Sequence, residues 1–218
     1  MKQGRDTTNE ERLKIGADEH NVPKAFRFHS AEELLAQPKL ADIAIICTQD
    51  RQHVPHAVAA LRKGYDILME KPISPFLSQL QEIVRVAREE NRRVVVCHVL
   101  RYTPFFQLIK QTIDSGRLGK IINIQALENV RYWHQAHSFV RGNWRRSDES
   151  SPMILAKCCH DLDYLVWLCG SRVERVSSFG SLNYFKPENA PERTSKRFRF
   201  RSTGIPARLA ASWLALPA

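Results

Sequence analysis

The stretch Ala-Asp-Ile-Ala-Ile-Ile-Cys-Thr, residues 41–48, decides the fold of this 218-residue chain. A continuous apolar run of this length that is rich in isoleucine is typical of a strand buried on both faces. Further short strands are predicted at 66–69 and 93–98, with helices between the strands at 54–63 and 78–90. Because strands that alternate with helices form parallel βαβ units, the sequence predicts an α/β fold with a doubly wound parallel sheet.

Additional helices are predicted on both sides of this unit. Asn9 is a candidate N-cap for a helix over 9–20, and residues 30–33 (Ser-Ala-Glu-Glu) have the pattern of a capping box for a second, short helix. On the C-terminal side, a helix is predicted over 104–115 and ends at Gly116.

The sequence pattern changes beyond Gly119. Residues 120–130 mix polar with apolar positions and are predicted to form the first strand of a different sheet, covered on one face only. A polar and aromatic loop, a helix over 153–169 and another strand over 173–182 follow. A domain boundary is therefore predicted near Gly119.

The composition indicates a globular protein of the cytoplasm. Hydrophobic residues make up 43% and charged residues 26% of the chain, which argues against a wholly disordered protein. No apolar run approaches the roughly 20 residues of a membrane helix, and the charged N-terminus is not followed by the apolar segment of a signal peptide. The five cysteines form no CxxC pair, lie inside apolar segments and are interpreted as reduced thiols of the core.

The net charge of +10 is concentrated at the C-terminal end. Residues 193–218 contain six basic and no acidic side chains. A reading-frame error or a truncation explains this change of pattern, and a genuine basic arm that binds nucleic acid or a membrane is the alternative. The first explanation is preferred because the tail ends in an apolar run, so neither nucleic acid nor a membrane is expected as a partner.

Polar residues follow all three predicted strands, in the segments 47–53, 70–72 and 98–104. In an open parallel sheet these segments meet at the carboxyl edge, where ligands bind. Solvation of a turn is the alternative explanation for each segment alone. Three of them at one edge favour a binding site.

The motifs in these segments resemble those of the Gfo/Idh/MocA oxidoreductases, the relatives of glucose–fructose oxidoreductase and inositol dehydrogenase. The resemblance covers about residues 6–192 and rests on Thr48 to His53, Glu70-Lys71-Pro72, Arg101-Tyr102-Thr103-Pro104, Ser115 to Gly119, Gly142-Asn143-Trp144-Arg145, and His160-Asp161-Leu162-Asp163 with Trp167 to Gly170. It implies a partial Rossmann domain over 1–118 and a partial α/β domain with an open, largely antiparallel sheet over 119–192, followed by the basic tail 193–218.

The resemblance also implies an activity. Members of this family transfer a hydride between NAD or NADP and a sugar, a cyclitol or a related polyol. We therefore expect the chain to be part of an NAD(P)-dependent dehydrogenase that forms a homo-oligomer through its second domain in the full-length protein. A non-enzymatic remnant of the family that binds substrate or forms oligomers is the alternative.

The expected site residues are carried over from the matching motifs. The resemblance implies a cofactor site made of Thr48, Gln49, His53, Glu70, Lys71 and Pro72. It implies Lys71 and His160 as catalytic residues, and it implies a substrate site made of Arg101, Tyr102, Trp144, Lys157 and Asp163. Oxidation of an alcohol requires removal of the hydroxyl proton as the hydride leaves, and His160 is the expected proton acceptor.

The helix predicted over 153–169 also supports a role for His160 without the resemblance. Leu162 begins a predicted core stripe with i, i+3, i+4, i+7 spacing, and Lys157, His160 and Asp163 share the neighbouring face. A lysine and a histidine on one face can line a pocket for an anion or a polyol. A solvated face with an ion pair between His160 and Asp163 is the alternative.

A zinc site is a weaker interpretation of the second domain. His134 and His137 could combine with Cys158 and Cys159, but without a paired CxxC motif this spacing does not define a zinc site, and no metal is expected. Tyr132, Trp133, His134 and His137 are expected to border a carbohydrate pocket, and packing within their own loop is the alternative.

The sequence departs from the family pattern in two places. None of the nine glycines has the Gly-x-Gly spacing that lets a backbone approach a pyrophosphate. The first strand, the phosphate turn, the first helix and most of the second strand are therefore expected to be missing, and the chain is expected to be truncated at both ends. The family also has an aspartate four residues before the histidine, where this chain has Ala156, so a different proton-relay partner is expected for His160.

The chain is predicted to bind NAD and NADP weakly. A glycine cradle supplies several backbone hydrogen bonds to the charged pyrophosphate, each worth roughly 1.5–3 kcal/mol, and this sequence lacks the cradle. Titration calorimetry is expected to show no binding in the micromolar range. A micromolar dissociation constant for either nucleotide contradicts the prediction.

Overall fold

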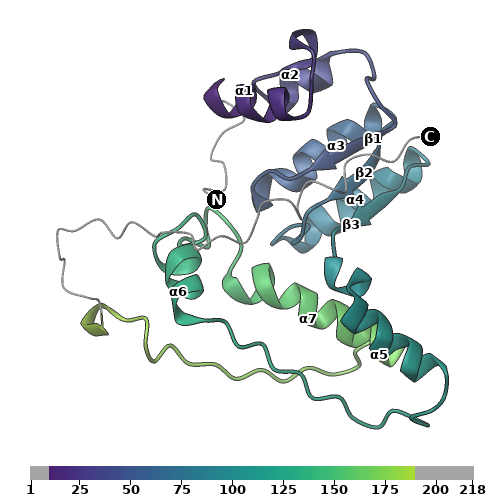
Figure 1. Cartoon of the computed structure of the whole chain (residues 1–218), viewed down its shortest axis with the longest axis vertical. Coiled ribbons are helices and arrows are strands. Elements are labelled where there is room, and N and C mark those ends of the chain that lie inside the picture. The colour runs from purple at the N-terminus through teal and green to yellow at the C-terminus, as the bar shows by residue number, and fades with distance from the viewer. Residues whose placement is uncertain (1–9, 190–218) are drawn as a thin grey trace. The chain divides into compact units, whose positions relative to one another are not determined.

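The computed structural model describes residues 10–189. The chain divides into two units, Met1–Ser178 and Phe179–Ala218, and every element discussed below belongs to the first. Its helices and strands are α1 (Glu10–Glu19), α2 (Ala31–Ala36), β1 (Ile43–Ile46), α3 (His53–Arg62), β2 (Asp66–Met69), α4 (Leu77–Glu89), β3 (Val94–Val96), α5 (Pro104–Asp114), α6 (Tyr132–Gln135) and α7 (Met153–Cys169) (Figure 1). Short helical turns η2 (Asp50–Gln52) and η3 (Val99–Tyr102) follow β1 and β3.

The three strands form one parallel sheet in the order β1-β2-β3. Ile43 pairs with Asp66, and Ile67 pairs with Val94, so each strand lies beside the next one along the chain. Helices α3 and α4 make the two crossovers between the strands. The prediction of parallel βαβ units is confirmed, and all three carboxyl ends of the strands lie at one edge of the sheet.

The hydrophobic core lies between one face of the sheet and the helices α3 and α4. Central strand β2 contributes Ile67 and Met69, which are almost completely buried, and α3 contributes Leu61. The other buried members are Ile46, Val54, Ala57, Val58, Ala60, Tyr65, Ile83 and Val86. Full burial of a side chain the size of Leu61 stabilises the fold by about 1.5–3 kcal/mol, so this cluster fixes the position of the sheet edge.

The opposite face of the sheet is exposed, which corrects the expectation of a strand buried on both faces. The exposed fractions of Ile43, Ile45 and Val95 are 56%, 52% and 50%. Ile45 and Val95 lie in register on either side of Leu68 and so form a row across the sheet. Side chains alternate along a strand, so the helices that cover Ile46 leave this row uncovered.

The two strands expected in the second domain are absent from the described structure. Residues 120–130 and 173–182 carry no regular secondary structure, and Ile122 is largely exposed. A strand requires a partner to satisfy its backbone groups, and neither segment pairs with another. The open, largely antiparallel sheet is therefore not observed within residues 119–189. The expected polar loop instead contains α6 and a turn of π-helix over Ala136–Val140.

The capping box predicted at the start of α2 is half formed, because the carboxylate of Glu33 accepts a hydrogen bond from the backbone N–H of His29 at 2.8 Å and not from that of Ser30. The hydroxyl oxygen of Ser30 accepts a hydrogen bond from the backbone N–H of Glu33 at 3.1 Å, as a capping residue does at the start of α2. Asn9 and the basic tail 193–218 lie outside the described residues. Across residues 10–189, no helix has the length and apolar character needed to cross a membrane.

The exposed sheet face predicts association in solution. An apolar row beside a free edge strand promotes contacts between molecules. Light scattering is expected to show oligomers or aggregates, and the double variant Ile45→Thr/Val95→Thr is expected to reduce them, because threonine keeps the β-branched shape and adds a hydroxyl. Ile122→Thr, which changes an exposed isoleucine outside the sheet, is the matched control. A monodisperse wild-type monomer contradicts the prediction.

Candidate active site

Lys71 connects the carboxyl edge of the sheet to helix α7. It lies two residues after Met69, the end of β2, and its Nζ donates a hydrogen bond to the backbone carbonyl of Ala156 at 3.0 Å. The carboxylate of the preceding residue, Glu70, accepts a hydrogen bond from the backbone N–H of Lys71 at 3.2 Å, and the Lys71–Pro72 peptide bond is cis. The ammonium of Lys71 is therefore held one helical turn before His160.

Two histidines meet beside this lysine. His98 follows β3, His160 lies on α7, and their rings pack edge to face with centroids 5.8 Å apart and planes at 84°. The Nδ1 atom of each ring is buried and has no hydrogen-bond partner within the described part of the chain. His98 is a site residue that the sequence analysis did not single out, although it begins the polar segment 98–104.

Arg101 and Asp163 are bound to each other. The Nε and Nη2 atoms of Arg101 each donate to a different carboxylate oxygen of Asp163, both at 2.7 Å. The guanidinium also lies over the ring of Trp167, 5.6 Å from its centroid. The hydrogen bond with Asp163 raises the pKa of Arg101. Two residues expected to bind substrate thus join η3 to α7, and Asp163 pairs with Arg101 in place of the alternative ion pair with His160.

The environment of the cluster favours a neutral imidazole at His160. Burial lowers the pKa of His160, and the nearby Lys71 ammonium and His98 ring lower it further. Burial lowers the pKa of Lys157, and Lys71 acts in the same direction. A neutral imidazole can accept a proton, so His160 is suited to act as a general base.

Helix α7 buries a different stripe from the one predicted. Leu162, the start of the predicted core stripe, is 61% exposed, and the buried side chains are Ala156, Tyr164 and Leu168. The ion pair of Asp163 and the hydrogen bond that Lys71 makes to α7 turn the polar face of the helix toward the sheet edge. These directed polar contacts outweigh the apolar periodicity of the helix.

Trp144 is fixed by a buried carboxylate. Its indole Nε1 donates to the two carboxylate oxygens of Asp50, at 3.3 and 3.1 Å, and Asp50 is only 4% exposed. The neighbouring Arg51 donates to the carbonyls of Ser147 and Ser150 at 2.7 and 3.2 Å. Asp50 and Arg51 therefore hold the loop that carries Trp144 against the turn after β1, a role that the sequence analysis did not assign to them.

His53 is buried between two turns of the sheet edge. Its Nδ1 lies 2.8 Å from the carbonyl oxygen of Pro72, and its Nε2 lies 3.0 Å from the carbonyl oxygen of Thr48. Each ring nitrogen thus lies against a backbone carbonyl, which can only accept a hydrogen bond, so His53 joins the two turns and its ring faces the backbone. Gln49 stands at the N-cap of η2, and Tyr102 is largely exposed.

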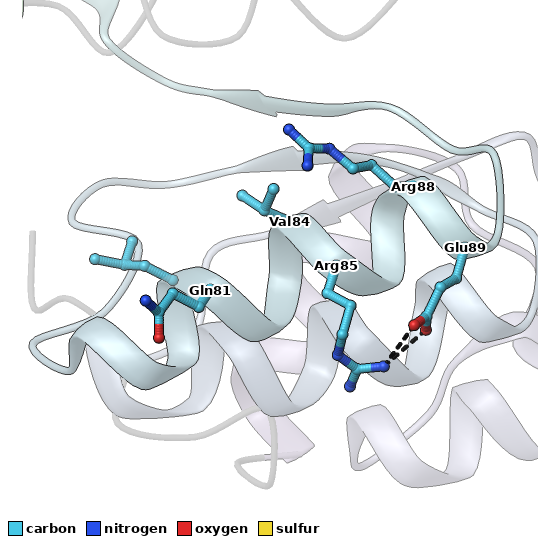
Figure 2. A pocket seen from close by; sticks show the side chains of 6 residues that line it. Gln81, Val84, Arg85, Arg88 and Glu89 are labelled. Atoms are coloured by element: carbon cyan, nitrogen blue, oxygen red, sulfur yellow. Dashed lines mark hydrogen bonds and ion pairs between the residues drawn. The ribbon is translucent and has the colours of Figure 1, made fainter.

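A hollow on the outer face of α4 lies apart from these residues. Figure 2 shows its lining, which comes from one helix and consists of Leu80, Gln81, Val84, Arg85, Arg88 and Glu89. Nη1 of Arg85 donates to both carboxylate oxygens of Glu89 at 2.8 Å. The carboxylate of Glu89 is therefore already paired, and we assign no site to this hollow.

The residues of the sheet edge fit one part of a nicotinamide dinucleotide. Lys71, His98 and His160 converge there with two unpartnered ring nitrogens, which suits the reacting end of the cofactor and its substrate. These residues do not include a binding turn for the pyrophosphate of the cofactor, because the sequence has no Gly-x-Gly turn. Within residues 10–189, no three His, Cys, Asp or Glu side chains are grouped as metal ligands.

A parallel βαβ sheet with a polar cluster at its carboxyl edge defines a Rossmann-like protein. Residues 5–98 match a family described as an oxidoreductase family with an NAD-binding Rossmann fold, and residues 106–218 match the GFO/IDH/MocA C-terminal domain. The chain belongs to the Gfo/Idh/MocA oxidoreductase family. The second match includes the tail 193–218, which lies beyond the motifs of the sequence analysis.

The relatives are longer proteins. The oxidoreductase YteT of Bacillus subtilis is 29% identical to this chain over 170 residues, which cover 78% of this chain and 39% of YteT. Inositol 2-dehydrogenase of Corynebacterium glutamicum (strain R) is 27% identical over 75% of this chain and 45% of its own length. The chain therefore spans less than half the length of these curated relatives.

Solved structures share the fold. Myo-inositol 2-dehydrogenase from Lactobacillus plantarum aligns with a TM-score of 0.61 and 19% identity, over 74% of this chain and 46% of the other. The WlbA dehydrogenase from Bordetella pertussis, crystallised with NADH and UDP-GlcNAcA, aligns with a TM-score of 0.58 and 24% identity, over 74% of this chain and 45% of the other. At these identities the likeness concerns the fold.

Removing the acid of the Arg101–Asp163 pair is predicted to destabilise the protein. Asp163→Asn leaves the guanidinium with one acceptor of its original two and is expected to lower the free energy of unfolding by about 1.5–3 kcal/mol. Urea denaturation measures this change. Glu89→Gln removes the acid of an exposed ion pair on α4, in which one nitrogen of Arg85 faces both carboxylate oxygens, and is the control, with an expected cost of at most about 0.5 kcal/mol. Equal costs for the two variants contradict the prediction.

Proposed function

We propose that this chain is the catalytic part of an NAD(P)-dependent oxidoreductase that transfers a hydride between the nicotinamide and a sugar, a cyclitol or a related polyol. The observation that carries the proposal is the position of His160 beside Lys71 at the carboxyl edge of a Rossmann-like sheet. The relatives support it, since they include inositol dehydrogenases and a dehydrogenase crystallised with NADH and UDP-GlcNAcA.

Each residue of the site has its own proposed role in alcohol oxidation. The unprotonated ring nitrogen of His160 accepts the proton of the substrate hydroxyl, while the C–H bond of the carbon that bears this hydroxyl breaks. When bound, the nicotinamide supplies the acceptor for the hydride. Lys71 orients the substrate oxygen through its ammonium, and Lys157 contributes a second, half-buried cation to the same region of α7.

The arrangement of the site supports narrower roles for the other expected residues. Arg101 and Asp163 position α7, and Trp144 borders the site from a loop that is anchored on Asp50. Thr48, Gln49, Glu70 and Pro72 belong to the turns that would face the cofactor. Assembly into a homo-oligomer through residues 119–192 and a location in the cytoplasm stay predictions.

Replacing either catalytic residue is predicted to reduce turnover. His160→Ala is expected to cost roughly 10²–10⁴-fold, the usual contribution of a general base, and Lys71→Ala is expected to reduce turnover in the same direction. The assay follows NAD(P)H formation at millimolar NAD or NADP with a panel of sugars and cyclitols. His29→Ala and Lys24→Ala, two changes at exposed positions, are the matched controls.

Two outcomes of this assay contradict the proposal. Near wild-type turnover of the His160 variant removes His160 from the mechanism. Absence of turnover with every substrate shows that the chain by itself is not a dehydrogenase, and it favours the alternative of a non-enzymatic family remnant.

A further inference from the structure

The proposed reaction leaves His98 without a role, although it is partly buried at the centre of the site. His98 follows the end of β3, the strand that lies beside β2 and Lys71. Its ring meets that of His160 edge to face at 5.8 Å. The two histidines come from different elements, so this contact exists only when α7 is docked on the sheet edge.

Neither ring has a hydrogen bond that fixes its proton. Nδ1 of His98 and Nδ1 of His160 are both buried and lack a partner within residues 10–189. The nearest acid, Asp163, lies 3.9 Å from Nδ1 of His98, but both of its oxygens accept hydrogen bonds from Arg101. The ring of His98 is therefore a titratable group from the sheet side that packs directly against the ring of His160.

The charged groups around the pair disfavour two protonated rings. Lys71 from the β2 edge and Arg101 from η3 are cations, and Asp163 and Asp161 on α7 are the acids that oppose them. Burial lowers the pKa of both histidines. Two like charges at this separation and with this burial repel strongly, so protonation of one ring opposes protonation of the other.

We infer that His98 is a positioning residue for His160, and that the two rings form a coupled pair that takes up one proton in place of two. The edge-to-face contact holds the His160 ring, and a neutral His98 leaves His160 free to accept the hydroxyl proton. A protonated His98 blocks that step. The catalytic meaning of the pair rests on the proposed function, whereas the coupling itself does not.

The test is an NMR titration of the imidazole resonances in the full chain without cofactor. In His98→Gln, the pKa of His160 is expected to rise by about half a pH unit or more, because a like charge is removed. In His160→Gln, the pKa of His98 is expected to rise in the same way. His29→Gln, which removes an exposed histidine before α2, is the control and is expected to change neither value.

The two reciprocal variants keep the inference falsifiable. If circular dichroism shows that His98→Gln has lost the fold, the measurement is made at His98 in the His160→Gln variant. Unchanged values in a folded variant overturn the inference, because a residue that only fills space would give that result. Since this titration needs neither cofactor nor turnover, its failure is distinguishable from failure of the dehydrogenase assay.

Discussion

Two parallel hydrogen bonds between Arg101 and Asp163 hold helix α7 against the sheet edge, and the geometry of the site depends on them. Arg101 lies on the turn that follows β3, so its guanidinium is fixed to the sheet by the chain itself. Asp163 then sets the rotation and the height of α7. That position brings His160 to His98 and places the carbonyl of Ala156 on Lys71.

This constraint explains why α7 presents a polar face inward. A helix with Leu162 exposed and Lys157 half-buried contradicts simple amphipathic packing. The bidentate pair satisfies a carboxylate that would otherwise be costly to bury, and it leaves the two imidazoles as the uncommitted groups beside it. Polar side chains with fixed partners therefore surround two histidines whose Nδ1 atoms have no partner in the described residues, which fits the proton transfer proposed for His160.

The local pattern of the sequence was sufficient to predict the sheet and its crossovers. The strand at 66–69, the helices around it and the Ser30 cap were predicted because each depends on neighbouring residues alone. Burial of Ile45 and a strand at 120–130 were predicted wrongly, since both require a partner element whose presence a local pattern does not reveal. The same limit applied to the site. Arg101 and Asp163 could be named as site residues, but the ion pair between them could not be predicted. The role of Asp50 became visible only through its hydrogen bond from Trp144.

The sequence separations of these contacts bear on the order in which the molecule assembles. Each strand pair joins residues one crossover apart, whereas the bonds of Arg101 to Asp163 and of Lys71 to Ala156 close loops of 62 and 85 residues. Loop closure costs more entropy over longer separations, so the βαβ unit is able to form before α7 docks. Undocking of α7 alone then separates His160 from the sheet while the core of β2 stays intact. The proposed active-site arrangement is therefore expected to form late and to be a less protected part of the native state, one that opens without global unfolding.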